Sequence, residues 1–314
     1  MDNGRSMSVR VKIDGLNKNF EKVEALKNIK LEIIPNELFG FIGPDGAGKT
    51  TLFRLITSLL LPNSGSIYVD DLNCEVDFKQ VRNIVGYMPG RFSLYYDLTV
   101  EENLNFYASI FKTTLKENYH LIKDVYEQIE PFKKRKAGDL SGGMKQKLAL
   151  SCALIHKPKL LILDEPTTGV DAVSRREFWE LLKKMQKTGI TILVSTPYMD
   201  EASLCDRVAL MQKGEVLAID KPINIVNDYH GDLWQVSTNN MNKLVSHMEG
   251  LDKRITQVFR FGETVHCTTM DIEESIVDEI IVEGLKKLNH DKIKIDRAHP
   301  QIEDCFLSLM VDNN

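Results

Sequence analysis

Apolar residues in the first two thirds of the chain form short runs that alternate with longer helical patterns. Ser8–Ile13 alternates apolar and polar positions, which predicts an edge strand, whereas Glu37–Gly43 is almost continuously apolar and ends in glycine, which predicts a buried central strand entering a turn. The other runs that predict strands are Lys159–Leu163, Ile190–Ser195 and Arg207–Met211. Apolar positions at helical spacing predict helices over Lys49–Leu60 and Ala172–Gly189. Strands that alternate with helices indicate an α/β domain with a largely parallel sheet.

The pattern changes twice along the chain. Residues 103–138 are amphipathic and charged, which predicts helices inserted between elements of the sheet. After about residue 228, short alternating stretches stand beside a helical pattern in Ser275–Leu288, which predicts a small α+β domain. The expected organisation is a first domain at 8–228 with a helical subdomain at about 90–158, followed by an accessory domain at 229–314.

Composition limits the possible functions. A net charge of -5 and a pI of about 5.9 provide no overall basic field for nucleic acid, so no nucleic-acid partner is expected. The longest apolar stretch, Leu55–Leu61, is interrupted by Thr57 and Ser58 and is far shorter than the ~18 residues of a membrane span. The N-terminal stretch has no signal-peptide core, and the widely spaced cysteines form no CxxC pair. These features favour a cytoplasmic protein whose role at a membrane would require a partner.

A phosphate-binding loop stands between the predicted central strand and the helix that begins at Lys49. The stretch GPDGAGKTT fits the P-loop pattern G-x-x-x-x-G-K-[ST]. Its glycines let backbone N–H groups turn toward phosphate oxygens, and the helix N-terminus adds positive partial charge. Lys49 can supply a point charge to the β- and γ-phosphates, and the Thr50 hydroxyl can bind Mg²⁺. The residues expected to bind nucleotide here are Gly43, Pro44, Asp45, Gly46, Ala47, Gly48, Lys49, Thr50 and Thr51.

A second buried strand is followed by two carboxylates. Leu160–Pro166 reads LLILDEP, which places Asp164 and Glu165 at the carboxyl end of a strand, where ligands bind in parallel α/β sheets. Asp164 can hold Mg²⁺ directly or through water, and Glu165 can act as a general base on the attacking water. Two acids at a strand end can also be ordinary loop residues, but the P-loop earlier in the chain favours the catalytic interpretation.

The stretch LSGGMKQKL, at Leu140–Leu148, resembles the ABC signature motif, and the chain resembles ABC-transporter nucleotide-binding subunits over Val11 to about Ile219. The tail PQIEDCFLSLM, at Pro300–Met310, is similar to the end of ATPase subunits in drug-resistance and ABC-2-type exporters. The resemblance implies a P-loop NTPase fold and an ATPase that uses ATP and Mg²⁺ to drive a separate transmembrane permease in export. It also implies a location on the inner face of the cell membrane and a homo- or heterodimer of ATPase subunits that shares two ATP molecules.

The resemblance assigns roles to further residues. Phe20 lies at the place of the residue that stacks on adenine, and Asp171, in the stretch TTGVD, lies in the D-loop. The signature residues that would complete the partner's ATP site are Ser141, Gly142, Gly143 and Gln146. The residues themselves also favour an anion-binding surface, because Ser141 is a suitable helix N-cap and the two glycines leave backbone N–H groups open.

Two positions depart from the family's pattern. Gly90 stands where a glutamine that helps bind Mg²⁺ and water is usual, and Pro197 stands where a histidine that contacts the γ-phosphate is usual. Proline has neither a side-chain donor nor a backbone N–H. We therefore hypothesise that the chain binds MgATP, hydrolyses it slowly at its own site, and pairs with a different, active subunit. The alternative is that Ser195, Thr196 or Tyr198 supplies the missing donor in a working homodimer, and the sequence favours neither.

Aromatic residues after the GYMPG stretch bear on the partner. Phe92, Tyr95 or Tyr96 is expected to line a groove that accepts a permease helix, although burial in a local core would also explain these side chains. Two rival functions are a soluble ABC ATPase of translation or DNA repair and a non-catalytic, ATP-gated regulatory subunit. No motif in 229–314 carries chemistry, and the scattered histidines there are expected at the surface.

Overall fold

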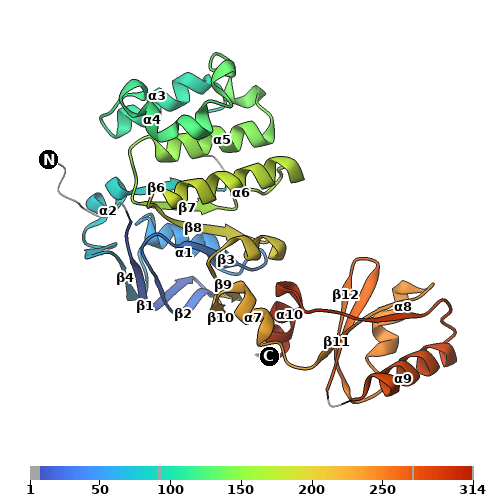
Figure 1. Ribbon diagram of the computed structural model, residues 1–314. Coiled ribbons are helices and arrows are strands. Elements are labelled where there is room, and N and C mark those ends of the chain that lie inside the picture. Colours follow the sequence, from blue (N-terminus) through green and yellow to red (C-terminus); the bar gives the residue numbers. More distant parts are fainter. Residues whose placement is uncertain (1–7, 91–93, 271, 313–314) are drawn as a thin grey trace. The chain divides into compact units, whose positions relative to one another are not determined.

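The computed structural model describes residues 8–90, 94–270 and 272–312, and the chain divides into two compact units between Pro222 and Ile223 (Figure 1). The boundary therefore lies a few residues before the one expected at 228, because helix α7 (Pro222–Asn227) falls almost entirely in the second unit. The assignment of an accessory role to the second unit stays a prediction.

A six-stranded sheet with the order β10-β9-β3-β8-β7-β6 forms the centre of the first unit. Strands β6, β7, β8, β3 and β9 run parallel, and β10 is an antiparallel edge strand. The bounds are Leu38–Ile42 for β3, Val85–Met88 for β6, Leu160–Asp164 for β7, Thr191–Thr196 for β8, Arg207–Gln212 for β9 and Glu215–Asp220 for β10. Every residue of β3 and of β7 is buried, which confirms the predicted buried strands and the parallel α/β fold.

A second sheet of the same unit is antiparallel, with the order β2-β1-β4-β5. Its strands are Val11–Phe20 (β1), Val23–Ile33 (β2), Ser64–Val69 (β4) and Leu72–Asn73 (β5). The prediction of an edge strand at Ser8–Ile13 is wrong, because β1 begins at Val11 and pairs with β2 on one side and β4 on the other. The alternation instead reflects one buried face, which contributes Val11, Ile13 and Leu16 to the core.

Helix α1 (Lys49–Ile56) packs between the two sheets. Its Leu52 and Phe53 are fully buried in one hydrophobic cluster with residues of β1, β2 and β3. The Phe53 ring meets the ring of Phe41 edge-on, with centroids 5.4 Å apart. The helix ends at Ile56 rather than at the predicted Leu60, because the backbone turns left-handed at Ser58, with φ of 59°. This packing fixes the helix N-terminus against the loop that precedes it.

The helices of the unit that follow α1 are α2 (Phe78–Ile84), α3 (Val100–Ile110), α4 (Leu115–Tyr126), α5 (Gly142–Leu154) and α6 (Ala172–Lys187). Helices α3, α4 and α5 lie together at the top of Figure 1, as the inserted subdomain predicts. Short 3-10 helices are η1 (Glu130–Phe132), η2 (Ala137–Asp139) and η3 (Met199–Leu204). Thr99 and Thr114 start α3 and α4 with capping boxes, and Gly189, with φ of 99°, follows the end of α6.

The second unit is the expected small α+β fold. Its elements after α7 are β11 (Asp232–Ser237), α8 (Met241–Met248), β12 (Ile255–Phe261), β13 (Thr264–Thr269), α9 (Glu274–Lys287), β14 (Lys294–Arg297) and α10 (Ile302–Asp312). The order βαββαβ with sheet order β12-β13-β11-β14 is the split βαβ arrangement. Two histidines depart from their expected place at the surface. His290 is 1% exposed, and its Nε2 lies 2.8 Å from Nδ1 of His247. The His266 side chain is 12% exposed, and its Nδ1 lies 2.7 Å from Oδ1 of the buried Asp304.

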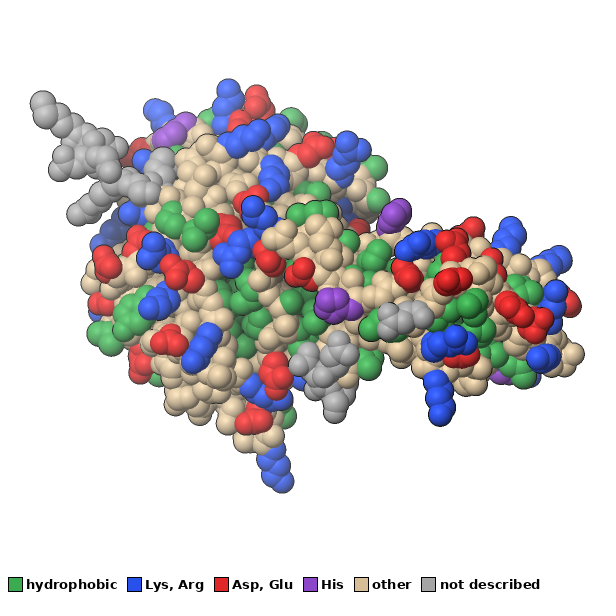
Figure 2. All heavy atoms as spheres, turned by 60° about the horizontal axis from the view of Figure 1, so that its bottom comes forward, with side chains coloured by type: hydrophobic (Ala, Val, Ile, Leu, Met, Phe, Trp, Pro, Cys, Tyr) green, Lys and Arg blue, Asp and Glu red, His purple; other side chains and the backbone are tan. Residues whose placement is uncertain are grey.

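Basic and acidic side chains are interspersed over the described residues of the face drawn in Figure 2. Within the described ranges, none of the helices combines the length and the apolar character that crossing a membrane requires.

Candidate functional site

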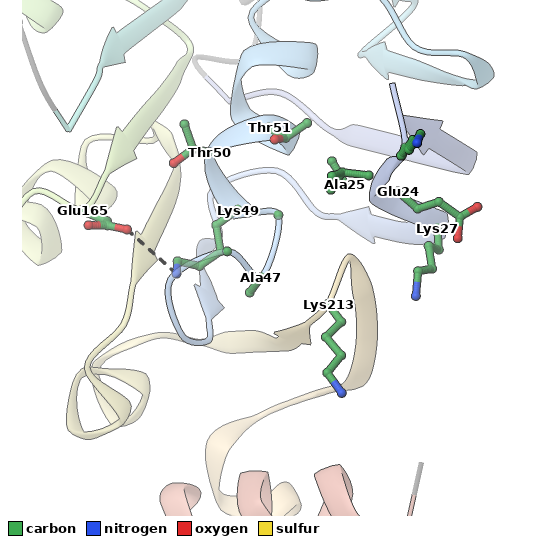
Figure 3. A pocket seen from close by; sticks show the side chains of 13 residues that line it. Glu24, Ala25, Lys27, Ala47, Lys49, Thr50, Thr51, Glu165 and Lys213 are labelled. Carbon is green, nitrogen blue, oxygen red and sulfur yellow. Dashed lines mark ion pairs between the residues drawn. The ribbon is translucent and has the colours of Figure 1, made fainter. Parts of the chain in front are cut away.

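The P-loop between β3 and α1 lines a cavity of about 520 Å³ (Figure 3). The lining residues of the loop and of the start of α1 are Gly46, Ala47, Gly48, Lys49, Thr50 and Thr51. The other described residues that line the cavity are Lys22, Val23, Glu24, Ala25, Lys27, Glu165 and Lys213. Gly48 has φ of 102°, and a Cβ there would stand 2.6 Å from the carbonyl oxygen of Ala25. Only glycine therefore allows the loop to approach β2 this closely.

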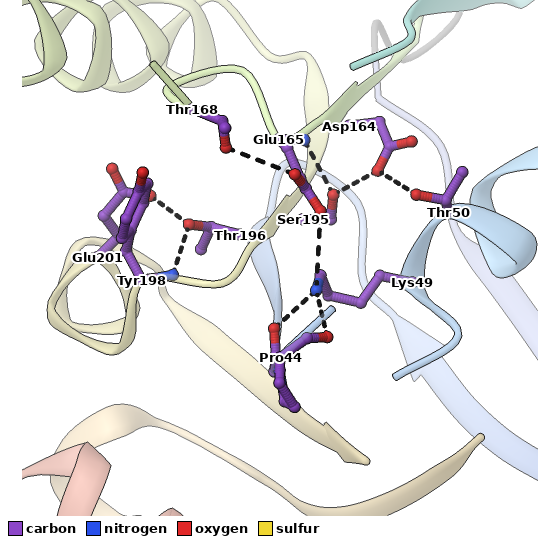
Figure 4. Close-up of polar contacts among 11 residues, drawn as sticks. Pro44, Lys49, Thr50, Asp164, Glu165, Thr168, Ser195, Thr196, Tyr198 and Glu201 are labelled. Carbon is purple, nitrogen blue, oxygen red and sulfur yellow. Dashed lines mark hydrogen bonds and ion pairs between the residues drawn. The ribbon is translucent and has the colours of Figure 1, made fainter. Parts of the chain in front are cut away.

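Lys49 is held by the loop itself (Figure 4). Its Nζ donates to the carbonyl oxygens of Gly43 at 2.6 Å and Pro44 at 2.9 Å, and lies 3.9 Å from Oε1 of Glu165. Burial lowers the pKa of Lys49, an effect that the nearby Glu165 carboxylate opposes. A phosphate oxygen would offer this ammonium a charged acceptor in place of two carbonyls.

Asp164 ends strand β7 beside the start of α1. Its Oδ1 accepts hydrogen bonds from Oγ1 of Thr50 at 3.1 Å and from Oγ of Ser195 at 2.6 Å, and the residue is 3% exposed. One carboxylate and one hydroxyl beside a phosphate-binding loop are the ligands that Mg²⁺ commonly takes together with phosphate and water oxygens. The residues present therefore fit a magnesium ion, which would be held by Asp164 and Thr50.

Glu165 is turned into the cavity by an unusual backbone conformation. Its φ is 49°, in the left-handed region, and its backbone N donates to Oγ of Ser195 at 3.0 Å and to the Ser195 carbonyl oxygen at 3.1 Å. The side chain is a quarter exposed, with Oγ1 of Thr168 3.5 Å from Oε2. A carboxylate in this place can accept a proton from a water in the cavity.

Ser195→Ala is expected to lower the free energy of unfolding by about 1–3 kcal/mol, because the buried Asp164 loses its shortest hydrogen bond. Ser203→Ala is the matched control, since that hydroxyl donates to the Asp200 carbonyl oxygen at an exposed position and its loss is expected to change stability by less than about 0.5 kcal/mol. Urea unfolding of both variants measures the difference. Equal losses would contradict the role given to Ser195.

Gly90 lies against the acid pair. A Cβ at this position would stand 3.0 Å from the carbonyl oxygen of Asp164 and 3.8 Å from Cβ of Glu165. A longer side chain at 90 would therefore start beside both carboxylates, but Asp164 would have to give by a few tenths of an ångström to admit it.

The hydroxyls near Pro197 are engaged elsewhere. Ser195 donates to Asp164, and Oγ1 of Thr196 donates to Oε2 of Glu201 at 2.6 Å. The Tyr198 ring lies under a guanidinium, and its backbone N donates to Oγ1 of Thr196 at 3.1 Å. Two of the three hydroxyls that could replace the missing donor are thus committed to carboxylates of the protein.

The signature residues form the exposed start of α5. The Ser141 side chain caps the helix by accepting from the backbone N of Met144 at 3.3 Å, as predicted. Ser141 and Gly142 are exposed, and Gln146 is half-buried. A Cβ on Gly143 would stand 2.8 Å from Oγ of Ser174, so α5 starts in close contact with α6. None of the described residues that line the P-loop cavity belongs to 141–146.

Two predicted residues lie beside the site rather than in it. Asp171 is the N-cap of α6, and the hydrogen bond from the backbone N of Ser174, 3.0 Å away, lowers its pKa. Phe20 is 43% exposed and is absent from the described lining of the cavity, although its pairing partner Val23 belongs to that lining. The cavity wall formed by β2 was not predicted from the sequence, where its only signal is that β2 begins shortly after Phe20.

The aromatic surface is partly described. Phe92 lies outside the described residues. Tyr95 and Tyr96 are 50% and 54% exposed, and the Tyr95 ring rests edge-on against Phe106 with centroids 4.7 Å apart. A core position therefore does not explain these two tyrosines.

Comparisons with known proteins agree with one another. The model of the ABC transporter family matches residues 26–168. The chain is 36% identical over 312 residues to the probable multidrug ABC transporter ATP-binding protein YbhF of Escherichia coli, covering 96% of this chain and 52% of that protein, so it spans about half of that relative's length. It is 32% identical over 305 residues to the Nod factor export ATP-binding protein I of a Rhizobium strain, covering 96% of this chain and 97% of that protein. A solved dimeric ATP-binding cassette in a post-hydrolysis state, bound to ADP and Pi, is similar with a TM-score of 0.61 and 27% identity over 67% of this chain and 98% of that one.

Proposed function

Because the chain belongs to the ATP-binding proteins of ABC transporters, we propose that it binds MgATP in the P-loop cavity and hydrolyses it to drive a separate membrane permease in export. The observation that carries this proposal is that Lys49, Thr50 and Glu165 line one cavity, while Asp164 accepts a hydrogen bond from Thr50 beside it. These residues come from the P-loop, the start of α1 and the end of β7, which are the places where the chemistry needs them.

The proposed roles follow from the contacts. Backbone N–H groups of the P-loop and the start of α1 would surround the phosphates, and Lys49 would exchange its two carbonyl acceptors for phosphate oxygens. Asp164 and Thr50 would hold Mg²⁺, which screens the charge of the phosphates when it is bound. Glu165 accepts a proton from the attacking water. Phe20, beside the wall formed by β2, would contact the base.

We propose a dimer because the signature lies outside the described lining of the chain's own cavity. The capped, exposed N-terminus of α5 at Ser141–Gly143, with Gln146, would meet the ATP of a second subunit, and Asp171 would lie at that junction. The dimeric cassette with ADP and Pi supports this arrangement by similarity. The partner subunit can be identical or different, and in this proposal the pair works at the inner face of the cell membrane with no nucleic-acid partner.

Slow hydrolysis at the chain's own site is part of the proposal. Gly90 and Pro197 have no side-chain donor, and the hydroxyls of Ser195 and Thr196 are committed to carboxylates. A different subunit with a complete site would then supply most of the turnover. Steady-state MgATP hydrolysis by the purified chain tests the function, with Glu165→Gln as the background. MgATP binding without turnover above that background would favour the degenerate site, and turnover measured with the partner subunit and permease would then test the rival function of a regulatory subunit.

The pair Tyr95→Ala and Tyr96→Ala is expected to reduce permease-stimulated ATP hydrolysis about tenfold or more, because exposed aromatic side chains are typical anchors of an interface. The affinity for MgATP should stay the same, since neither tyrosine lines the cavity as described. ATPase assays with and without membranes that hold the permease measure the effect. Tyr68→Ala, at a tyrosine 38% exposed on β4, is the control. Full stimulation of the double variant would exclude this surface as the docking site.

A further inference from the structure

The carboxylate of Glu201 lies beside the Thr196 hydroxyl at the end of β8 (Figure 4). Glu201, in η3, is 2% exposed. Its Oε2 accepts hydrogen bonds from Oγ1 of Thr196 at 2.6 Å and from Oγ1 of Thr167 at 3.1 Å. Thr196 directly precedes the proline, and Thr167 lies in the loop after Glu165. The Glu201 carboxylate therefore links the loop after Glu165, the candidate base, to residues 197–204, which we call the Pro197 segment.

Arg175, near the start of α6, supplies the matching positive charge. Its Nε lies 3.2 Å from Oε1 of Glu201, and its Nη2 lies 3.1 Å from Oδ2 of Asp200. Its guanidinium carbon lies 4.4 Å from the centroid of the Tyr198 ring. A buried carboxylate without a partner is strongly unfavourable, and the Arg175 guanidinium supplies the opposite charge beside Glu201. The Arg175 side chain thus contacts Tyr198, Asp200 and Glu201, which all follow Pro197 in the chain.

Arg175 lies in the first turn of α6, which is capped and hydrogen-bonded. The backbone N of Arg175 donates to the carbonyl oxygen of Asp171 at 2.9 Å, and the Asp171 side chain caps the same turn. Gly143 of α5 packs against the neighbouring Ser174. The ion pair of Arg175 therefore fixes the Pro197 segment against α6, although the two are not adjacent in the chain.

We propose that Arg175 is a positioning residue which, through Glu201, holds the Pro197 segment in one arrangement whether or not nucleotide is bound. A residue with a donor at 197 could be ordered by a phosphate, but proline offers none. The Thr196 hydroxyl and the Tyr198 backbone N both point to partners within the protein. The contrast between bound and free nucleotide rests on the proposed MgATP function, whereas the ordering by Arg175 is a property of the chain itself.

Amide hydrogen exchange of residues 198–204 in the full chain tests the proposal. The wild-type segment should be equally protected with and without MgATP. Arg175→Ala should speed its exchange about tenfold or more, because the buried Glu201 loses its counter-charge, and MgATP should not restore protection. Arg176→Ala is the matched control, since that neighbouring arginine is 85% exposed and pairs only with Glu180 among the contacts described. It should leave the segment unchanged.

Two further variants separate positioning from a general structural role. Arg175→Lys keeps the charge but not the planar stacking on Tyr198, so it should restore part of the protection. Arg175→Ala combined with Pro197→His adds a side-chain donor at position 197 that a phosphate could order, so MgATP should now restore protection of 198–204. If Arg175→Ala acted only by loosening the packing, MgATP could not restore protection of 198–204 in this double variant. Absence of that restored protection with MgATP bound would therefore overturn the positioning role.

Two results overturn the proposal directly: an Arg175→Ala segment that exchanges like wild type, or a wild-type segment that gains protection on MgATP binding. Exchange at the P-loop, residues 43–51, keeps the two proposals apart. Without any MgATP-induced protection there, the nucleotide function fails, while the comparison of Arg175→Ala with wild type in the absence of nucleotide still decides the ordering.

Discussion

Glu165→Gln is expected to lower steady-state MgATP hydrolysis by the purified chain about 10²–10⁴-fold, to the background of the assay. The Glu165 carboxylate lines the cavity and lies 3.9 Å from Nζ of Lys49, so it is placed to take a proton from a water that attacks the terminal phosphate. An amide has nearly the same shape but cannot accept that proton. Affinity for MgATP should be kept, because the loop, Lys49 and Thr50 are unchanged.

Glu180→Gln is the matched control for this experiment. Glu180 lies on α6, is 61% exposed and pairs with Arg176, so its turnover should equal that of the wild type. Phosphate release and equilibrium MgATP binding are measured on all three proteins. A wild-type turnover no higher than that of Glu165→Gln, with MgATP still bound, would contradict hydrolysis by the purified chain and favour the degenerate site, which needs a second ATPase subunit.

Pro197→His is expected to raise the turnover of the purified chain about 10²–10³-fold, which is the usual worth of one positioned donor to developing charge. The imidazole can donate where proline cannot, and the committed hydroxyls of Ser195 and Thr196 leave that task open. Pro197→Ala is the control at the same position, because it removes the ring without adding a side-chain donor, and it should not raise turnover.

Gly90→Gln belongs with this test as a second step. Its Cβ would stand 3.0 Å from the Asp164 carbonyl oxygen, so the strand end must shift slightly before the amide can reach the cavity. We therefore expect a smaller gain from Gly90→Gln alone than from Pro197→His. Unchanged turnover in the double variant would mean that the chain hydrolyses ATP normally with the residues it has, and the slow-site hypothesis would be abandoned.

The core of the candidate site could be predicted because short stretches of the sequence specify it. Lys49 follows a glycine-rich loop that comes after the buried strand β3. Asp164 ends the buried strand β7, and Glu165 follows it. The carboxyl ends of these parallel strands lie at one edge of the sheet, so they bring the three residues together. Ser141 was predictable for the same reason, since an N-cap depends on the residues next to it in the chain.

Long-range contacts explain what the sequence did not show. Periodicity reported that one face of β1 is buried but not that β2 and β4 flank it, because pairing register is decided by partners far along the chain. For the same reason, the sequence did not indicate that Val23 lines the cavity. Burial of Glu201 depends on Arg175 from another element, and acidic residues in a short polar stretch normally predict a surface position.

The order of strands in the six-stranded sheet also sets when the site can form during folding. Leu38 of β3 pairs with Ile192 of β8, and Phe39 pairs with Arg207 of β9, so the strand that leads into the P-loop acquires both neighbours only after most of the first unit has been made. Such non-local pairing slows folding, since loop closure comes before the contacts that compensate it. The P-loop strand, apolar throughout, is therefore a segment of the nascent chain that needs protection from aggregation until β8 and β9 emerge from the ribosome.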